Sequence, residues 1–169
     1  MKKVLATAII AVFALSSCLK QDNKCGYNDS AVTAPESEIN NLEDSLAKYG
    51  ITGAQISPSG FLYTIEQAGT GPGVTNLCSN ITVEYKGAFF DGKIFDSTKT
   101  GMPAFFQLGG VILGWQKGIP LIKEGGSMHL YVPPTLAYGP NAVKDQTTGA
   151  VVIPGNSYLV FEVKVLKIN

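Results

Sequence analysis

The stretch NITVEYKGAFFDGKIFD, residues 80–96, carries the clearest structural pattern in the chain. Its first half alternates between apolar and polar residues, so that Ile81, Val83 and Tyr85 fall on one face of an extended strand. The pair Asp91-Gly92 then supplies a turn of the kind that joins two antiparallel strands. The stretch therefore predicts a β-hairpin with one apolar face.

Segments on both sides of this hairpin also alternate. GFLYTIEQAG (60–69) turns Leu62 and Thr64 away from Tyr63 and Ile65. SMHLYVPP (127–134) and NSYLVFEVKVLKI (156–168) each present one apolar face, formed by Met128, Leu130 and Val132 in the first and by Leu159, Phe161, Val163 and Val165 in the second. Only VILGWQKGIPLI (111–122) is typical of a short helix in this region. We therefore predict an α+β fold, with a twisted antiparallel sheet wrapped around one short helix.

An additional amphipathic helix is expected before the sheet. In PESEINNLEDSLAKYG (35–50), the residues Ile39, Leu42, Leu46 and Tyr49 recur at helical spacing. Pro35 suits the first turn and Gly50 suits the stop. The helix could pack on its own domain, which we favour, or on a second copy of the chain. We assign residues 35–57 to this helix and its linker, and residues 58–169 to the main domain.

The N-terminus has the features of an export signal. Lys2 and Lys3 precede an apolar run over residues 4–15, which is too short to cross a bilayer comfortably. The ending Leu15-Ser16-Ser17-Cys18 resembles a bacterial lipobox, in which cleavage before the cysteine is followed by lipidation of its thiol. We expect a signal peptide over residues 1–17 and a lipid on Cys18. The alternative is an ordinary signal peptide, with Cys18 an incidental cysteine.

Residues 18–34 are polar and lack periodicity, which predicts a lipidated flexible tether. The tether contains Cys25, and Cys78 lies in the main domain. An exported protein can form a disulfide between them, but two free thiols are an equal alternative. No CxxC motif or paired Cys/His spacing is present, so no metal site is expected.

Charge and composition exclude several functions. All 13 basic residues are lysine, and 13 acidic residues balance them, so binding to nucleic acid is not expected. The single histidine, His129, has no second histidine or neighbouring cysteine with which to build a catalytic triad, and we expect it to be solvated. Asp91 belongs to the hairpin turn, so Asp91 and Asp96 do not indicate a carboxylate pair. The sequence therefore offers no acid/base machinery.

The chain does carry aromatic residues at strand ends and on the short helix: Tyr85, Phe95, Phe106, Trp115, Tyr138 and Phe161. Each could belong to the hydrophobic core, or together they could line an apolar pocket. The stretch VPPTLAYGP (132–140) bears on this choice. Its prolines cannot continue a central strand, so Tyr138 lies in a turn after the strand ends.

Four motifs, in order, resemble one known family. VEYKGAFFDGKIFDST, GWQKGI, VPPTLAYG and IPGNSYLVFEVKVLKI look like an FKBP-type peptidyl-prolyl cis-trans isomerase, over about residues 58–169. The N-terminal helix followed by SPSGFLYTIEQAGTG is similar to exported bacterial members. The resemblance implies a half-open antiparallel barrel around the short helix. It also implies an enzyme, a peptidylprolyl isomerase that rotates X–Pro bonds and requires no cofactor.

The same resemblance implies roles for individual residues. Trp115 would form the floor of a proline pocket, with Tyr85, Phe95 and Phe161 as walls and Tyr138 at its border. Asp96 would form a hydrogen bond within the pocket, and is not needed as a general base. Val111 and Ile112 would contact the substrate backbone, and Ile153 would line the pocket.

The chain departs from the family pattern at three places. Between the stretch Pro103 to Gly109 and Val111, it is about two residues shorter than well-studied members. Ala104 stands where an aromatic is common, which makes the neighbouring Phe105 a weak candidate for the pocket. The loop after Tyr138 is longer than usual and lacks the family's histidine, so its shape is not predicted.

Two function classes follow from this pattern. We favour an isomerase that acts on proline-containing polypeptide clients and assists the folding of envelope or secreted proteins. Leu19 after Cys18 favours the outer membrane as the site of its lipid anchor. The alternatives are a proline-peptide-binding or chaperone module with little turnover and, less favoured, a generic anchored β-rich domain.

Overall fold

The structure is a computed structural model that describes residues 25–169. The expected signal peptide, Cys18 and Leu19 lie outside the described residues. No helix within residues 25–169 combines the length and the apolar character needed to cross a bilayer.

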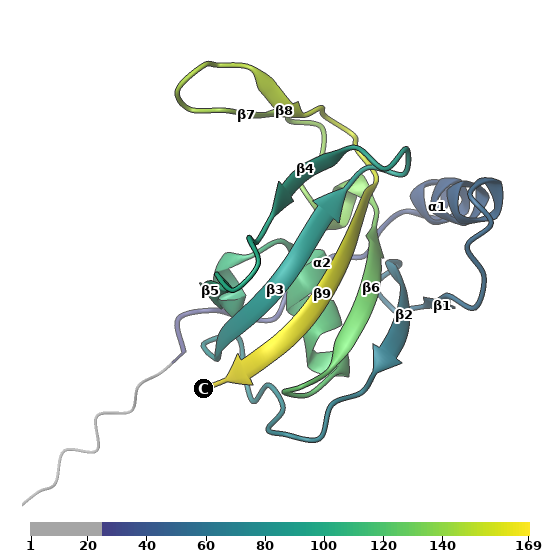
Figure 1. The fold of residues 1–169 in the computed structure, drawn as a ribbon. Helices are drawn as coiled ribbons and strands as arrows, with labels where there is room; N and C mark the ends of the chain where they lie inside the picture. The colour runs from purple at the N-terminus through teal and green to yellow at the C-terminus, as the bar shows by residue number, and fades with distance from the viewer. Residues whose placement is uncertain (1–24) are drawn as a thin grey trace, which may run out of the picture.

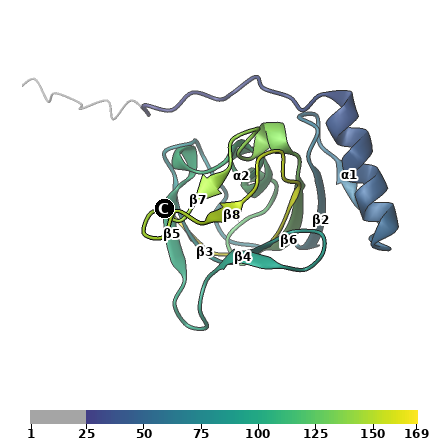
Figure 2. The ribbon, with the colours of Figure 1, turned by 90° about the horizontal axis from the view of Figure 1, so that it is seen from above.

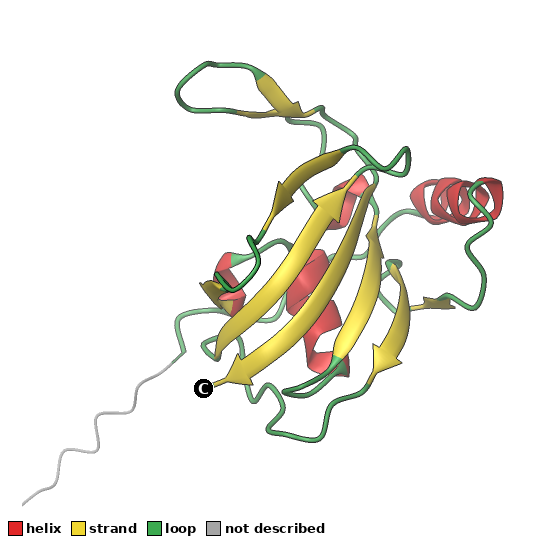
Figure 3. Ribbon diagram, viewed as in Figure 1, coloured by secondary structure: helices red, strands yellow, loops and turns green. Residues whose placement is uncertain are grey.

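An antiparallel sheet of seven strands forms the body of the described chain (Figures 1 and 3). Its strands are β1 (Gln55–Ile56), β2 (Leu62–Gln67), β3 (Asn80–Ala88), β4 (Ile94–Ser97), β5 (Ala104–Gln107), β6 (Ser127–Val132) and β9 (Leu159–Ile168). The spatial order is β1-β2-β6-β9-β3-β4, and β5 pairs with the first part of β3. The sheet curls around the short helix α2 (Leu113–Gly118), as Figure 2 shows. The predicted α+β architecture is confirmed.

Alternation along the central strands builds the core between the sheet and α2. Val83 pairs with Val165 across β3 and β9, and Leu130 pairs with Phe161 across β6 and β9. All four side chains are buried. The alternation seen in the sequence therefore assigns the inner face of the sheet correctly.

Two glycines allow α2 to lie directly on β6. A Cβ atom at Gly114 would lie 2.6 Å from Val132, and one at Gly118 would lie 2.5 Å from Leu130. Both distances are far below van der Waals contact, so any side chain here would push the helix off the sheet. This close docking places Trp115, which lies between the two glycines, against the inner face of the sheet.

Helix α1 (Glu36–Lys48) follows Pro35, and Gly50 (φ +67°) lies just beyond its end. Its buried residues Leu42 and Leu46 pack against Leu62 of β2 and Tyr131 of β6. Because Leu62 and Tyr131 alternate with core residues, α1 covers part of the outer face of the sheet (Figure 1). The helix thus packs on its own domain.

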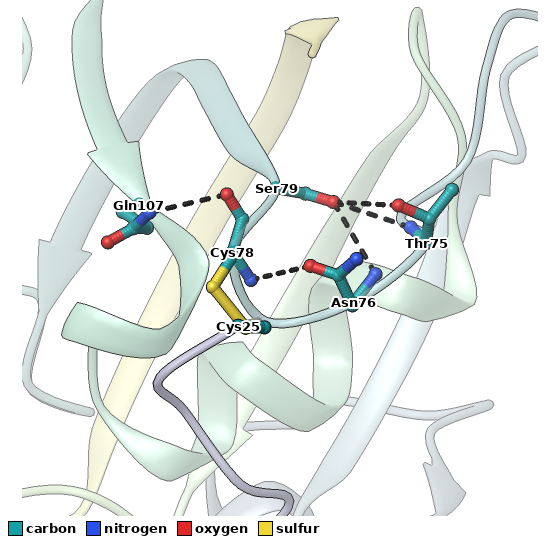
Figure 4. The surroundings of a disulfide bond; sticks show 6 residues. All are labelled: Cys25, Thr75, Asn76, Cys78, Ser79 and Gln107. Atoms are coloured by element: carbon teal, nitrogen blue, oxygen red, sulfur yellow. Dashed lines mark hydrogen bonds between the residues drawn. A yellow bond between two sulfur atoms is a disulfide. The ribbon is translucent and has the colours of Figure 1, made fainter. Parts of the chain in front are cut away.

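The segment before α1, which we call the N-terminal strap (Cys25–Ala34), is attached to the domain along its length. A disulfide joins Cys25 to Cys78, with a Cα–Cα distance of 5.6 Å (Figure 4). Lys117 of α2 donates to the Ser30 carbonyl at 2.5 Å, and the Ala34 amide donates to the Ser59 carbonyl at 2.9 Å. Residues 25–34, which were predicted from their polar composition to form part of a flexible tether, therefore make long-range contacts with the domain.

The long loop after Tyr138 forms a second, two-stranded sheet, β7 (Val143–Lys144) and β8 (Val151–Ile153), which projects beyond the main sheet (Figure 1). Asp145 organises its turn by accepting hydrogen bonds from the backbone and hydroxyl of Thr148 and from the Thr147 amide. These bonds lower the pKa of the Asp145 carboxyl.

Candidate active site

A cavity of about 270 Å³ opens beside the N-terminal end of α2. Its walls come from β3, β4, β5, α2 and β9, from the connection between β5 and α2, and from the turn after β6. Its lining residues are Tyr85, Phe95, Asp96, Phe106, Gly110, Val111, Ile112, Trp115, Tyr138 and Phe161. The structure thus brings together every pocket residue that the resemblance named except Ile153 and the weak candidate Phe105.

Trp115 forms the floor of this cavity. The side chain is only 4% exposed, and its ring makes edge-to-face contacts with Tyr85, Phe161 and Phe106 at centroid distances of 5.3, 5.5 and 6.0 Å. The indole N–H has no hydrogen-bond partner among residues 25–169. The ring is therefore held by packing against its aromatic neighbours.

A glycine in β3 makes room for the next aromatic wall. A Cβ atom at Gly87 would lie 2.7 Å from the Phe95 ring and 3.0 Å from Phe161. Without that atom, Phe95 crosses over β3 and meets Phe161 edge to face at 5.7 Å. Gly87 therefore allows strand β4 to contribute an aromatic side chain to the cavity.

The polar part of the cavity is one short hydrogen bond. The Tyr85 hydroxyl donates to Asp96 Oδ2 at 2.5 Å. Burial raises the pKa of the Tyr85 phenol, and the bond to Asp96 and its negative charge raise it further. Burial also raises the pKa of Tyr138, with a smaller contribution from Asp96. Both phenols are therefore neutral at physiological pH and act as hydrogen-bond donors or apolar walls.

The Tyr85 environment predicts a specific pH dependence. Because folding raises the phenol pKa, stability from the Tyr85–Asp96 bond is complete below about pH 10, the ordinary phenol value, and is lost as pH rises above it. We expect Tyr85→Phe to remove an ionisation that lies well above pH 10, measured by ultraviolet phenolate absorbance. If the difference between the wild-type and Tyr85→Phe titration curves is centred at or below pH 10, the pKa of Tyr85 is not raised and this prediction is wrong.

A glutamine fixes the backbone beside the cavity. Gln116 Nε2 donates to the Val111 carbonyl at 2.7 Å and to the Gly109 carbonyl at 3.2 Å. The Ile112 carbonyl accepts from the Trp115 amide at 2.9 Å, which starts α2. The Ile112 amide itself has no acceptor among residues 25–169, so its N–H is available to a ligand.

Two apolar residues lie elsewhere than the resemblance suggested. Ile153 is 3% exposed and packs in the core, outside the set that lines the cavity. Phe105, the weak candidate, is 63% exposed and is not among the residues that line the cavity. Its neighbour Phe106, which pairs with Ile81 across β5 and β3, lines the cavity instead. Phe106 is one of the six aromatics that the sequence offered as possible pocket residues, and its pairing with the inward-facing Ile81 accounts for its position.

The remaining candidates for chemistry do not form a second centre. His129 lies on the side of β6 opposite the core residues, with Nδ1 3.0 Å from Glu66 Oε1, and is partly covered. Within residues 25–169, no cluster of three His, Cys, Asp or Glu side chains has the geometry to hold a metal ion.

Comparison with known proteins agrees with this geometry. Residues 75–166 match the family model for FKBP-type peptidyl-prolyl cis-trans isomerases. The chain belongs to this family. Over 92% of its length, this FKBP-type chain is 36% identical to the isomerase FkpA of Buchnera aphidicola subsp. Schizaphis graminum. Over 69% of its length, it is 41% identical to FkpA of Escherichia coli K12.

Solved structures give the same result. The FKBP-type chain is similar to FkpA from Escherichia coli (TM-score 0.61, 36% identity, covering 79% of this chain and 63% of that one). It is also similar to an isomerase from Pseudomonas syringae (0.65, 28%, covering 82% and 98%) and to AtFKBP13 (0.62, 32%, covering 70% and 100%). The matched region spans only 61% and 41% of the two FkpA sequences named above.

Proposed function

We propose that this FKBP-type chain is a peptidyl-prolyl cis-trans isomerase that rotates X–Pro bonds in polypeptides. The observation that carries the proposal is the aromatic cavity with Trp115 as its floor and the free Ile112 amide at its edge. A proline ring is a compact apolar group that suits a cavity of about 270 Å³.

The cavity can act without proton transfer. The barrier to rotation, about 18–20 kcal/mol, comes from amide resonance, which is lost when the bond twists. A twisted amide has less charge separation than a planar one, so an apolar cavity favours the transition state over the ground state. Each tenfold acceleration requires about 1.4 kcal/mol of this preference.

The polar residues of the site then have positioning roles. The Ile112 N–H can donate to a carbonyl of the bound peptide, which places the proline over Trp115. Asp96 holds the Tyr85 hydroxyl, and the Tyr85 ring in turn contacts Trp115. Asp96 therefore fixes one wall of the cavity and does not need to exchange a proton with the substrate.

The test follows cis/trans exchange of a short X–Pro peptide by NMR, with and without the protein. The expected result is exchange that is much faster than spontaneous isomerisation, which takes tens to hundreds of seconds. Peptide shifts without faster exchange would instead support the second candidate, a proline-peptide-binding or chaperone module. The observation that favours that candidate is Ala104, a small side chain where an aromatic residue is common in the family, beside Phe105, which is exposed and outside the cavity.

We also propose that the protein is exported, carries lipid on Cys18 and assists the folding of envelope or secreted proteins from the outer membrane. The support is the sequence Leu15-Ser16-Ser17-Cys18 after a short apolar run, and Leu19 after it. Metabolic labelling with a fatty-acid analogue should label the wild type and the Cys25→Ala control. Label that persists in Cys18→Ala would contradict the anchor.

A further inference from the structure

Helix α1 reaches the candidate site through one carboxylate. Glu38, in the first turn of α1, accepts a hydrogen bond from the Thr135 amide at 3.0 Å and another from the Thr135 hydroxyl at 2.8 Å. The two donors occupy different oxygens of the carboxylate, and the contact is partly buried. Bonds of this kind, to a charged acceptor, are stronger and more directional than bonds between neutral groups.

Thr135 is the central residue of a short 3-10 turn, η3 (Pro134–Leu136), which leads directly to Tyr138. The amides of Ala137 and Gly139 both donate to the Pro134 carbonyl at 2.9 Å, and Leu136 is fully buried. The turn is therefore compact, and a shift at Thr135 would be transmitted to Tyr138.

Tyr138 depends on this backbone for its position. Its side chain is 41% exposed, and its hydroxyl has no hydrogen-bond partner among residues 25–169. Neighbouring walls are held differently: Tyr85 is bonded to Asp96, and Trp115 is packed among three rings. Tyr138 is thus the wall that requires support from outside the cavity.

Helix α1 also holds the other end of the same segment. Asn41, one turn after Glu38, donates to the Tyr158 hydroxyl at 3.2 Å. The Asn156 amide, two residues earlier, donates to the Gly139 carbonyl at 2.8 Å. Helix α1 therefore contacts both ends of the segment that connects β6 to β9 and contains β7 and β8.

A helix-stabilising role alone does not account for Glu38. Acidic residues in the first turn favour the positive end of the helix dipole, but Glu36 already occupies that turn and is exposed, with no side-chain hydrogen bond among residues 25–169. We propose that Glu38 is a positioning residue, which holds Thr135 so that Tyr138 borders the cavity. This inference rests on the proposed isomerase function and makes α1 part of the substrate-binding apparatus.

The experiment measures peptide affinity by NMR titration, together with KM and kcat, in the full-length chain. We expect Glu38→Ala to weaken peptide affinity and raise KM by roughly five- to tenfold, with kcat little changed because Trp115 and Tyr85 keep their contacts. The matched control, Glu36→Ala, removes the same charge from the same turn and should leave both values unchanged. Equal effects of the two variants would overturn the inference.

A double-mutant cycle separates positioning from general loss of structure. If Glu38 acts through Tyr138, Glu38→Ala should have little further effect on affinity in a Tyr138→Ala background. Thr135→Val, which removes one of the two bonds without touching α1, should give part of the effect even if Glu38→Ala folds poorly. Full additivity in the cycle, or wild-type affinity in Thr135→Val, would overturn the inference. A wild-type chain that binds the peptide without turnover would contradict the proposed function, while the affinity measurements still test Glu38.

Discussion

Replacing Trp115 with alanine should lower kcat/KM for an X–Pro peptide by about 100-fold or more, the equivalent of two or more 1.4 kcal/mol steps. The indole is the floor of the cavity and touches Tyr85, Phe106 and Phe161. Its removal enlarges the cavity, admits water and frees three aromatic walls at once. The measurement is NMR exchange of the peptide at saturating and subsaturating concentrations.

The same substitution will also destabilise the fold, because truncating a buried tryptophan typically costs about 3–5 kcal/mol. Two further variants separate the effects. Trp115→Phe keeps an apolar ring in the floor and should retain more activity than Trp115→Ala. Ile122→Ala removes a core side chain that does not line the cavity, and should reduce stability while the folded fraction keeps its turnover. Undiminished turnover in folded Trp115→Ala would refute the assignment of the floor.

Loss of the Cys25–Cys78 disulfide should also have a large effect on stability. The bridge closes a loop with a sequence separation of 53 residues. Loop-closure entropy for that length predicts a loss of about 4 kcal/mol from the free energy of unfolding. The bridge is supported on the Cys78 side, where the Cys78 amide donates to Asn76 and its carbonyl accepts from Gln107 (Figure 4).

The measurement is denaturant unfolding of the wild type with and without reductant, beside the paired variant Cys25→Ala/Cys78→Ala. The reduced wild type and the paired variant should share one midpoint, below that of the oxidised protein. The paired variant should also be insensitive to reductant. Identical wild-type midpoints in both conditions would show that the bridge does not form in solution.

Much of the fold was predictable because it depends on local patterns. The turn at Asp91-Gly92 between β3 and β4 requires the positive φ that Gly92 adopts (+84°). The inward set on β9, which includes Phe161 and Val163, follows directly from period-two alternation.

The family motifs predicted most of the residues that line the cavity. The two exceptions, Phe105 and Ile153, have a related physical cause. Phe105 and Phe106 are adjacent and chemically identical, and only the register of β5 on β3 decides which one faces the cavity. Ile153 lies at the end of a hairpin whose course depends on contacts made by distant residues. The pairing partner decides such a position, as Ile81 does for Phe106, and that partner lies far away in the sequence.

The N-terminal strap was missed for a related reason. Its polar residues cannot form a core, which is the usual requirement for order. Instead Cys25 forms a covalent bond, Lys117 binds the Ser30 carbonyl, and the Tyr27 ring lies against Gly109, where a Cβ atom would be only 2.2 Å from it. Each of these contacts joins residues that are far apart in sequence.

The disulfide at Cys25 would limit the distance between a lipid on Cys18 and the folded domain. If Cys18 carries lipid, the covalent path from the membrane surface to the first fixed point on the domain is seven residues, at most about 25 Å long. A chain free as far as Pro35 would allow about 60 Å. For a protein anchored in this way, the intact disulfide would keep Cys78 within that distance of the lipid, and reduction would leave only the noncovalent contacts of the N-terminal strap to limit it.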